Sequence, residues 1–437
     1  MTELPFCNFL FVFFIGKIEV SIKDKGEDKM ANRIMLNETS YHGAGAIKEI
    51  ANEAKARAFK KAFVCSDPDL IKFGVTSKVT DVLDEAGLAY EIYSDIKANP
   101  TIQNVQHGVE AFKASKADYI IAIGGGSSMD TSKAIGIIIA NPEFEDVRSL
   151  EGVAPTKKPC VPIIAVPTTA GTAAEVTINY VITDVERKRK FVCVDPHDMP
   201  VIAVIDPEMM SSMPKGLTAS TGMDALTHAI EAYVSTANSD YTDPLALHAI
   251  KMIQEDLIGS YNEDMEKRDA MHNAQCLAGM AFSNALLGIV HSMAHKTGAA
   301  FADYGAHIIH GAANAMYLPK VIAFNAKDPT AKKRYGQIAD FMKLGGNTDD
   351  EKVELLIRYV RHMNDELNIP HCIKNYGSDS YPTEQGFVPE NVFLERLPEI
   401  AANAILDACT GSNPRQPSQE EMEKLLKCCY YDTEVDF

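Results

Sequence analysis

Short apolar runs alternate with amphipathic stretches through the first half of the chain. The runs that predict buried strands are KAFVCSD (61–67), YEIYSDI (90–96), YIIAIGGGS (119–127), VPIIAVPTT (161–169) and VIAVIDP (201–207). Between several of them, apolar residues recur at helical spacing, as in 102–116 and 129–141. Strands separated by helices predict a parallel sheet covered by helices, with ligands at the carboxyl ends of its strands.

The pattern changes after residue 207. Segments such as 221–235, 243–261 and 350–367 repeat apolar residues at helical spacing, and strand-like alternation is scarce. A chain of 437 residues is also too long for one ordinary hydrophobic core. We therefore predict an α/β domain over 30–207 and an all-helical domain over 208–437.

The first 29 residues fit neither domain. The apolar run FCNFLFVFFIG (6–16) is shorter than the roughly 20 residues needed to span a bilayer. Glu3 precedes it where a secretory signal would carry basic residues, and no small-residue cleavage site follows. We predict that residues 1–29 are a poorly ordered extension of a cytoplasmic protein.

Composition narrows the class of ligand. The formal net charge of −18 argues against binding to nucleic acid or to an anionic membrane, so a small-molecule substrate is expected. The nine cysteines include no C-x-x-C pair, which predicts free thiols in a reducing compartment and argues against a zinc ribbon.

A glycine-rich segment, IGGGSSMDTSKAIG (Ile123–Gly136), follows a predicted strand and opens a predicted helix. Three glycines let the backbone approach a ligand, and the N–H groups of a helix start favour an anion. Met129 stands where the dinucleotide-binding fingerprint G-x-G-x-x-G has its third glycine. The GK[ST] sequence of a P-loop does not follow either. The segment predicts a phosphate-binding loop, with a plain tight turn as the alternative.

Two other strand ends bear on the cofactor. PTTAGTAAEVT (167–177) gathers hydroxyl and small side chains where a second phosphate or a ribose would lie. Asp67 follows the first predicted strand, where a carboxylate can accept a hydrogen bond from an adenosine 2′-hydroxyl and repel a 2′-phosphate. Asp67 therefore favours NAD over NADP; the alternative is that it caps a helix.

Two i,i+4 pairs in the helical half predict a metal site. Asp224 and His228 share one helical face, as do His291 and His295. Either pair alone favours a hydrogen-bonded, semi-buried patch, but both pairs in one apolar helical domain, with further histidines nearby, favour a divalent metal. The remaining histidines outside the stretch 291–310 are predicted to be surface or capping residues; they are His42, His107, His197, His248, His272, His362 and His371.

These motifs together resemble the iron-containing (group III metal-dependent) alcohol dehydrogenases over residues 30–437. The landmarks are GGGSSMDTSKAIG, PTTAGTAAEVT, GMDALTHAIEAY, GMAFSNALLGIVHSMAH and CTGSNPRQPS (Cys409–Ser418). The resemblance implies a dehydroquinate synthase-like fold, bound NAD, Fe²⁺ with Zn²⁺ as the alternative metal, and a homodimer. It is strongest toward members that reduce lactaldehyde to 1,2-propanediol, with 1,3-propanediol, butanol and glycerol as alternative substrates.

The resemblance also assigns roles to residues. Asp224, His228 and His291 match three metal ligands, and His295 matches a non-ligand catalytic histidine near the nicotinamide. The positions that match cofactor contacts are Asp67, Asn99, Gly125, Gly126, Ser127, Asp130, Thr168, Thr169, Thr172, Asn179 and Lys188.

The fourth metal ligand is less direct. The family places it in a Pro-His-Gly context, whereas here an inserted ADYGA (302–306) intervenes and Ile309 replaces the proline. His310 still precedes GAANAMYLP, which matches the segment after the family's ligand. We therefore assign His310, with His307 as the alternative.

Two rival functions remain. A lyase of the dehydroquinate synthase type would need a cluster of basic residues for a sugar phosphate, and the motifs AFSNALL and HKTGAAF are mostly apolar. A non-catalytic metal- or nucleotide-binding protein would have little use for intact metal and cofactor motifs together. The sequence therefore favours an alcohol dehydrogenase.

Overall fold

The computed structural model describes residues 32–187, 189–298, 300–383 and 386–437. The predicted N-terminal extension (1–29) and Lys188 lie outside the described residues.

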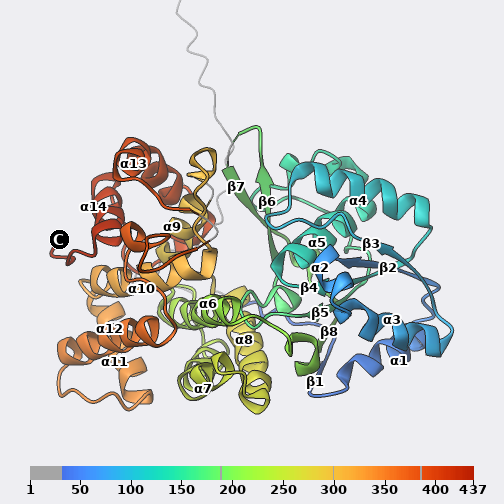
Figure 1. The fold of residues 1–437 in the computed structure, drawn as a ribbon, viewed down its shortest axis with the longest axis horizontal. Helices are drawn as coiled ribbons and strands as arrows, with labels where there is room; N and C mark the ends of the chain where they lie inside the picture. The colour runs from blue at the N-terminus through green and yellow to red at the C-terminus, as the bar shows by residue number, and fades with distance from the viewer. Residues whose placement is uncertain (1–31, 188, 299, 384–385) are drawn as a thin grey trace, which may run out of the picture.

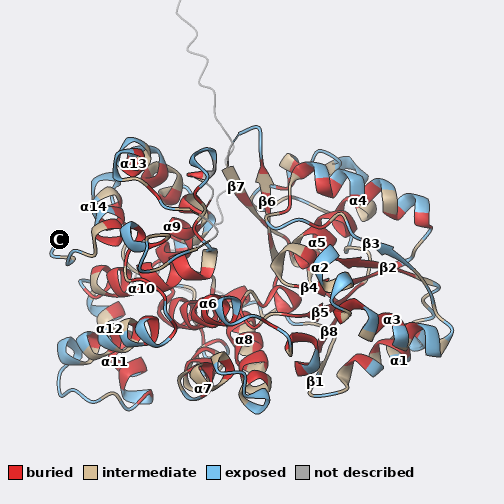
Figure 2. Ribbon diagram, viewed as in Figure 1, coloured by how far each residue is buried: buried red, intermediate tan, exposed pale blue. Residues whose placement is uncertain are grey.

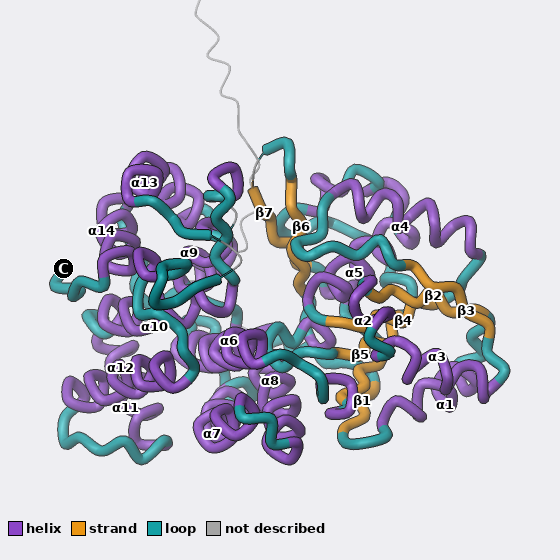
Figure 3. Tube along the Cα trace, in the orientation of Figure 1, coloured by secondary structure: helices purple, strands orange, loops and turns teal. Residues whose placement is uncertain are grey.

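The first half of the chain forms a six-stranded parallel sheet with the strand order β1-β8-β5-β4-β2-β3 (Figure 3). Its strands are β1 (Thr39–His42), β2 (Lys61–Ser66), β3 (Ala89–Tyr93), β4 (Tyr119–Gly124), β5 (Ile163–Pro167) and β8 (Ile202–Ile205). All five predicted strands form, but β3 is a mostly exposed edge strand and not a buried one as predicted; β1, a four-residue edge strand, was not predicted.

Helices cover both faces of this sheet. They are α1 (Glu49–Ala56), α2 (Pro68–Lys72), α3 (Val75–Ala86), α4 (Ile102–Ser115) and α5 (Gly126–Ala140). Strand β4 alternates between the two cores: Ile120 and Ala122 pack with α4 and α5, whereas Ile121 and Ile123 pack with α1 and α3. Burial on both faces explains why the strands read as continuous apolar runs.

An antiparallel hairpin, β6 (Asn179–Asp184) and β7 (Arg189–Val194), is the second sheet. Its inner face packs on the core of α4 and α5. In Figure 1 the hairpin lies between the α/β part and the helical part, and β7 contacts α9.

The described residues of the second half form helices and connecting loops, with no strand. Its helices are α6 (Lys215–Val234), α7 (Asp243–Tyr261), α8 (Met265–Ala285), α9 (Ile289–Thr297), α10 (His310–Asn325), α11 (Pro329–Phe341), α12 (Asp349–Glu366), α13 (Glu390–Ile405) and α14 (Gln419–Tyr431). The predicted α/β-plus-helical fold class is thus confirmed.

Helix α6 forms the centre of the helical part (Figure 2). Every side chain from Thr218 to Val234 is buried, and the helix packs against α7, α8 and α10. A helix surrounded on all sides has no solvent face, so the polar side chains that α6 carries must find partners inside the protein.

Among the described residues, no single helix has the length and apolar character to cross a membrane. The pair α8 and α9, bent by 102° at their junction, passes the same length and composition test together.

Candidate metal and cofactor site

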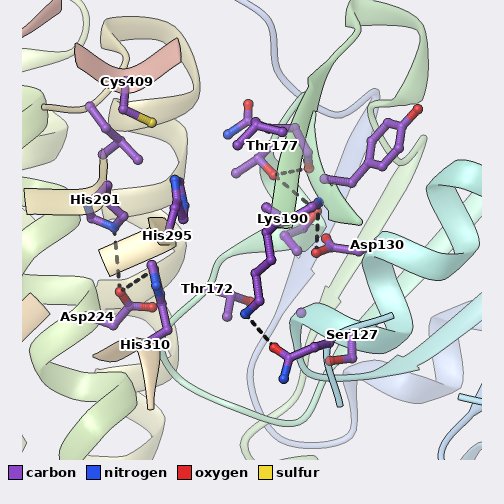
Figure 4. Close-up of a pocket in the computed structure, with 18 of the residues that line it drawn as sticks. Ser127, Asp130, Thr172, Thr177, Lys190, Asp224, His291, His295, His310 and Cys409 are labelled. Atoms are coloured by element: carbon purple, nitrogen blue, oxygen red, sulfur yellow. Dashed lines mark hydrogen bonds and ion pairs between the residues drawn. The ribbon is translucent and has the colours of Figure 1, made fainter. Parts of the chain in front are cut away.

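One carboxylate and three imidazoles meet where α6, α9 and α10 come together: Asp224, His228, His291 and His310. Figure 4 labels Asp224, His291 and His310 of this cluster. The Oδ1 atom of Asp224 lies 3.6 Å from Nε2 of His291, 3.7 Å from Nε2 of His310 and 3.9 Å from Nε2 of His228. Four ligands in tetrahedral geometry at about 2.1 Å from an ion lie about 3.4 Å apart, close to these distances. Asp224, His291 and His310 place possible ligand atoms within 4.8 Å of one another, which fits a divalent metal ion, and His228 lies beside this group through its contact with Asp224.

The protonation states of the cluster also favour a cation. Burial lowers the pKa of His228 to about 3 and puts the pKa of His310 well below its ordinary value, so both rings keep a free lone pair. Burial alone would raise the pKa of Asp224, but the neighbouring histidines His228 and His310 hold it below the ordinary value. Asp224 thus supplies one negative charge, and His228 and His310 supply neutral nitrogen donors. Burial would lower the pKa of His291, but its hydrogen bonds to Asp224 and Glu231 raise it to about 9, so His291 must lose a proton before it can bind a metal.

Glu231, one turn beyond His228 on α6, was not predicted from the sequence. It is buried, and its carboxylate accepts hydrogen bonds from Nδ1 of His291 (2.6 Å) and from the backbone N–H of Val290 (2.8 Å). The side-chain oxygen of Asn413 accepts a hydrogen bond from the preceding backbone N–H, that of Ile289 (3.2 Å). Glu231 fixes the ring of His291 by Nδ1, which turns Nε2 toward Asp224 (3.6 Å) and Asn314 (3.2 Å) at the cluster.

We predict that Glu231→Gln weakens metal affinity by about 10- to 100-fold, because the amide cannot replace the anionic acceptor behind His291. Competition against a chromophoric chelator measures this. Glu354→Gln is the matched control, since Glu354 is exposed and pairs with Arg358 on its own helix. Equal affinities for the two variants would contradict the role given to Glu231.

Close packing of α10 on α6 brings His310 beside Asp224. A Cβ atom on Gly311 would overlap the backbone oxygen of Ser220, so only glycine permits this approach. One turn later, Asn314 donates through Nδ2 to Oδ1 of Asp224 (2.6 Å). Gly311 and Asn314 thus both keep the carboxylate of Asp224 close to the imidazole of His310.

The glycine-rich segment between β4 and α5 lies across one pocket from the Asp224 cluster (Figure 4). Gly124 ends β4 with a φ of +148°, a conformation that favours glycine, and Gly125 then precedes the first residue of α5. The predicted residues that line this pocket are Asn99, Gly126, Ser127, Asp130, Thr172 and Asn179, together with the metal cluster and His295. The loop thus presents a helix N-terminus to the metal site.

Four predicted cofactor residues lie outside the pocket lining. Gly125 packs against the side chain of Thr169, and Thr168 donates its backbone N–H to Gly124 (3.0 Å). Asp67 caps α2, accepting from the N–H groups of Asp69 (3.0 Å) and Leu70 (2.9 Å). These residues shape the strand ends beside the pocket, and the capping role weighed for Asp67 is present in the structure.

Lys190 reaches the pocket from the hairpin and was not predicted. Its Nζ donates to Oδ1 of Asn99 (2.6 Å), and burial lowers its pKa to about 8. Alternate hairpin residues line the pocket, Val181 and Thr183 from β6 and Val192 from β7, in register with Lys190. The hairpin alternation would have pointed to Lys190, had the strands been recognised.

Asp130 is the acidic partner on the same side. Its carboxylate accepts from the backbone N–H of Val181 (3.1 Å), and burial raises its pKa to about 7 despite the nearby Lys133. The cofactor side of the pocket therefore combines a helix N-terminus, an amine and a carboxyl group.

The inserted segment 302–306 is fixed on the surface of α13. Arg396 donates to both carboxylate oxygens of Asp303 (2.7 Å each) and stacks on Tyr304 at 4.7 Å. His307, which follows, does not join the cluster, whereas His310 does.

One prediction about the remaining histidines is wrong. His272 was expected at the surface, but it is fully buried on α8, and burial lowers its pKa to about 3. Within the described chain neither ring nitrogen has a hydrogen-bond partner, and the residue lies outside the pocket lining. Helix α8, which carries His272, packs on α6 and α7 and also on the sheet domain, so His272 has no contact with solvent.

Fold and site together define a two-domain oxidoreductase with a cleft between a phosphate-type loop and a carboxylate–histidine cluster. The family model "Iron-containing alcohol dehydrogenase" matches residues 37–207, and "Fe-containing alcohol dehydrogenase family, C-terminal" matches residues 218–430. The chain therefore belongs to the iron-containing alcohol dehydrogenases, and the predicted family and enzyme class are confirmed.

Relatives cover nearly the whole chain. Lactaldehyde reductase from Escherichia coli strain K12 is 48% identical over 91% of this chain and 99% of its own. NADPH-dependent butanol dehydrogenase from Clostridium saccharobutylicum is 45% identical over 93% of this chain and 100% of its own. The crystal structure of a 1,3-propanediol oxidoreductase has a TM-score of 0.83 and 33% identity, covering 92% of this chain and 100% of its own.

Proposed function

We propose that this enzyme is an NAD(H)-dependent, Fe²⁺-containing alcohol dehydrogenase that interconverts lactaldehyde and 1,2-propanediol. The observation that carries the proposal is that the Asp224 cluster and the Ser127 loop line opposite sides of the same pocket. A substrate between them would touch both a metal and a nicotinamide.

Asp224, His228, His291 and His310 would hold the metal, and a bound divalent ion supplies Lewis-acid polarisation of an aldehyde oxygen for hydride transfer from the nicotinamide. Imidazole-rich sites accept several divalent metals, so Zn²⁺ remains the alternative to Fe²⁺. The geometry of one carboxylate and three nitrogens supports either ion.

The chain's own residues position the reactants. The N–H groups that begin α5, at Gly126 and Ser127, would bind the cofactor's pyrophosphate, with Lys190 adding positive charge. His295 lines the pocket between cofactor and metal sides and would accept the alcohol proton during oxidation. In its protonated form it would return a proton to the substrate oxygen during reduction, since imidazole titrates near neutral pH.

A small substrate fits the lining between these groups. Phe282, Leu287 and Val192 supply apolar surface beside the metal cluster. The names of three relatives refer to lactaldehyde, butanol and 1,3-propanediol. Because an apolar pocket separates substrates that differ by one methylene by only about 1–3 kcal/mol, a substrate panel must rank them.

The test is NADH oxidation by iron-loaded protein, purified anaerobically, with lactaldehyde, glycolaldehyde, 3-hydroxypropanal and butanal. We expect the highest kcat/KM with lactaldehyde and loss of turnover with a chelator, restored by Fe²⁺. Turnover that survives complete metal removal would overturn the proposed mechanism. A higher kcat/KM with another aldehyde would replace lactaldehyde as the substrate.

Asp67 gives a separate prediction about cofactor choice. Asp67→Asn should raise kcat/KM for NADPH relative to NADH by at least about tenfold, because a carboxylate repels a 2′-phosphate. Asparagine preserves the cap of α2, so the helix should remain intact. Asp69→Asn removes an exposed charge two residues away and is the matched control. An unchanged cofactor ratio in both variants would show that Asp67 is only a cap.

The rival lyase function lacks support in the pocket. Of the described residues that line it, Lys190 is the only lysine or arginine, too few for a sugar phosphate in addition to a dinucleotide. The described cysteines are free thiols, which supports the proposed cytoplasmic location. The family resemblance supports a homodimer, which light scattering tests.

A further inference from the structure

Asp407 begins the CTGSNPRQPS segment and is nearly buried. It caps the short helix η9 (Ala408–Ser412), accepting from the backbone N–H of Cys409 (3.1 Å). Its other carboxylate oxygen faces α9, more than a hundred residues earlier in the chain. Asp407 thus joins the C-terminal segment to the helix that carries His291 and His295.

Two side chains of α9 share that oxygen. Nζ of Lys296 lies 2.8 Å and Nδ1 of His295 lies 3.2 Å from Oδ2 of Asp407. Burial alone would raise the pKa of Asp407, but His295 and Lys296 hold it below the ordinary value. The carboxylate is therefore anionic, with Lys296 compensating its charge, and it accepts the proton that His295 carries on Nδ1.

This hydrogen bond decides which ring nitrogen faces the reaction. An ionised carboxylate can only accept, so Nδ1 of His295 is the nitrogen that carries a proton toward Asp407. With Nδ1 turned to Asp407, Nε2 is the nitrogen left for the pocket, and across the described chain no side chain hydrogen-bonds it. The ring lies 5.3 Å from that of His310 in a stacked arrangement, next to the metal cluster.

The same side chains raise a competing explanation. His295, Asp407 and Cys409 bring possible ligand atoms within 4.8 Å of one another, as a second metal site would. However, both oxygens of Asp407 already accept hydrogen bonds, and burial puts the pKa of the Cys409 thiol well above its ordinary value. A thiolate and a free carboxylate, which a metal requires, are both disfavoured.

We propose that Asp407 is a positioning residue for catalysis, which holds His295 by Nδ1 so that Nε2 faces the substrate beside the metal. The inference rests on the proposed alcohol dehydrogenase function and on the proton-transfer role given there to His295.

The test replaces Asp407 with asparagine and with serine in the metal-loaded, full-length enzyme. Both residues cap a helix as aspartate does, but neither offers His295 an anionic acceptor. We expect kcat to fall about 10- to 100-fold, part of what general acid–base catalysis contributes, with the KM for NADH and the metal content unchanged. Asp432→Asn breaks a comparable carboxylate pairing with Lys320 far from the pocket and is the matched control.

A double-mutant cycle gives the decisive readout. In a His295→Ala background, Asp407→Asn should cause no further loss of kcat, because its effect passes through the missing ring. An undiminished loss in that background, or a loss of metal from the Asp407 variants, would overturn the positioning role. If His295→Ala alone leaves kcat unchanged while chelation still abolishes turnover, the proton-transfer role of His295 fails and the metal-dependent function stands.

Discussion

His310→Ala should lose its metal and about a thousandfold of its turnover, whereas His307→Ala should keep both. His310 lies 3.7 Å from Oδ1 of Asp224 through Nε2, in the cluster of potential ligands. His307 follows the inserted segment and is not a member of that cluster. The loss expected for His310 corresponds to the several kcal/mol that a metal contributes to a transition state, at about 1.4 kcal/mol for each tenfold.

Metal analysis by mass spectrometry and NADH oxidation on the same samples measure this pair of variants. Each is the control for the other, because both remove an imidazole from the same segment. Loss of metal from His307→Ala with retention in His310→Ala would reverse the assignment and shift the register of α10 relative to the family.

Gly311→Ala should separate α10 from α6 and so disrupt the cluster without touching a ligand. The added Cβ would overlap the backbone of Ser220, and a backbone atom cannot rotate away as a side chain can. We expect a loss of about 1–3 kcal/mol in the free energy of unfolding, typical of overpacking, together with reduced metal affinity.

Gly216→Ala is the matched control for this prediction. Gly216 is also the second residue of a helix, α6, but its Cβ would meet no atom within 4 Å. There alanine should be neutral or stabilise by about 0.5–1 kcal/mol, because it restricts the unfolded chain. Denaturant unfolding and chelator competition on both variants distinguish the packing effect from helix propensity; equal stability of the two would contradict it.

The sequence predicted best the strands that are buried along nearly their whole length. Strands β2, β4 and β5 are buried on both faces and read as plain apolar runs. The hairpin β6–β7 was missed because it buries one face only and turns its other face to a pocket. β1 was missed because four edge residues carry too little pattern.

The site was predictable as far as its residues stand at helical spacing or in recognised motifs. Asp224 with His228, and the loop at Ser127, could be read locally. Glu231, Asn314 and Asp407 could not, because each acts on a partner far away in the chain, such as His291 for Glu231. Lys190 was missed for another reason: its place depends on the register of an unrecognised hairpin.

The first backbone amides of α9 depend on distant parts of the chain for their hydrogen bonds. Gly288, which precedes the helix, has no side chain to cap it, and the helix is nine residues long, too short to be stable alone. Its first amides, those of Ile289 and Val290, are instead satisfied by Asn413 and Glu231 from distant segments. Hydrogen exchange at these two amides therefore reports directly how often the segment that carries His291 and His295 detaches from the rest of the protein.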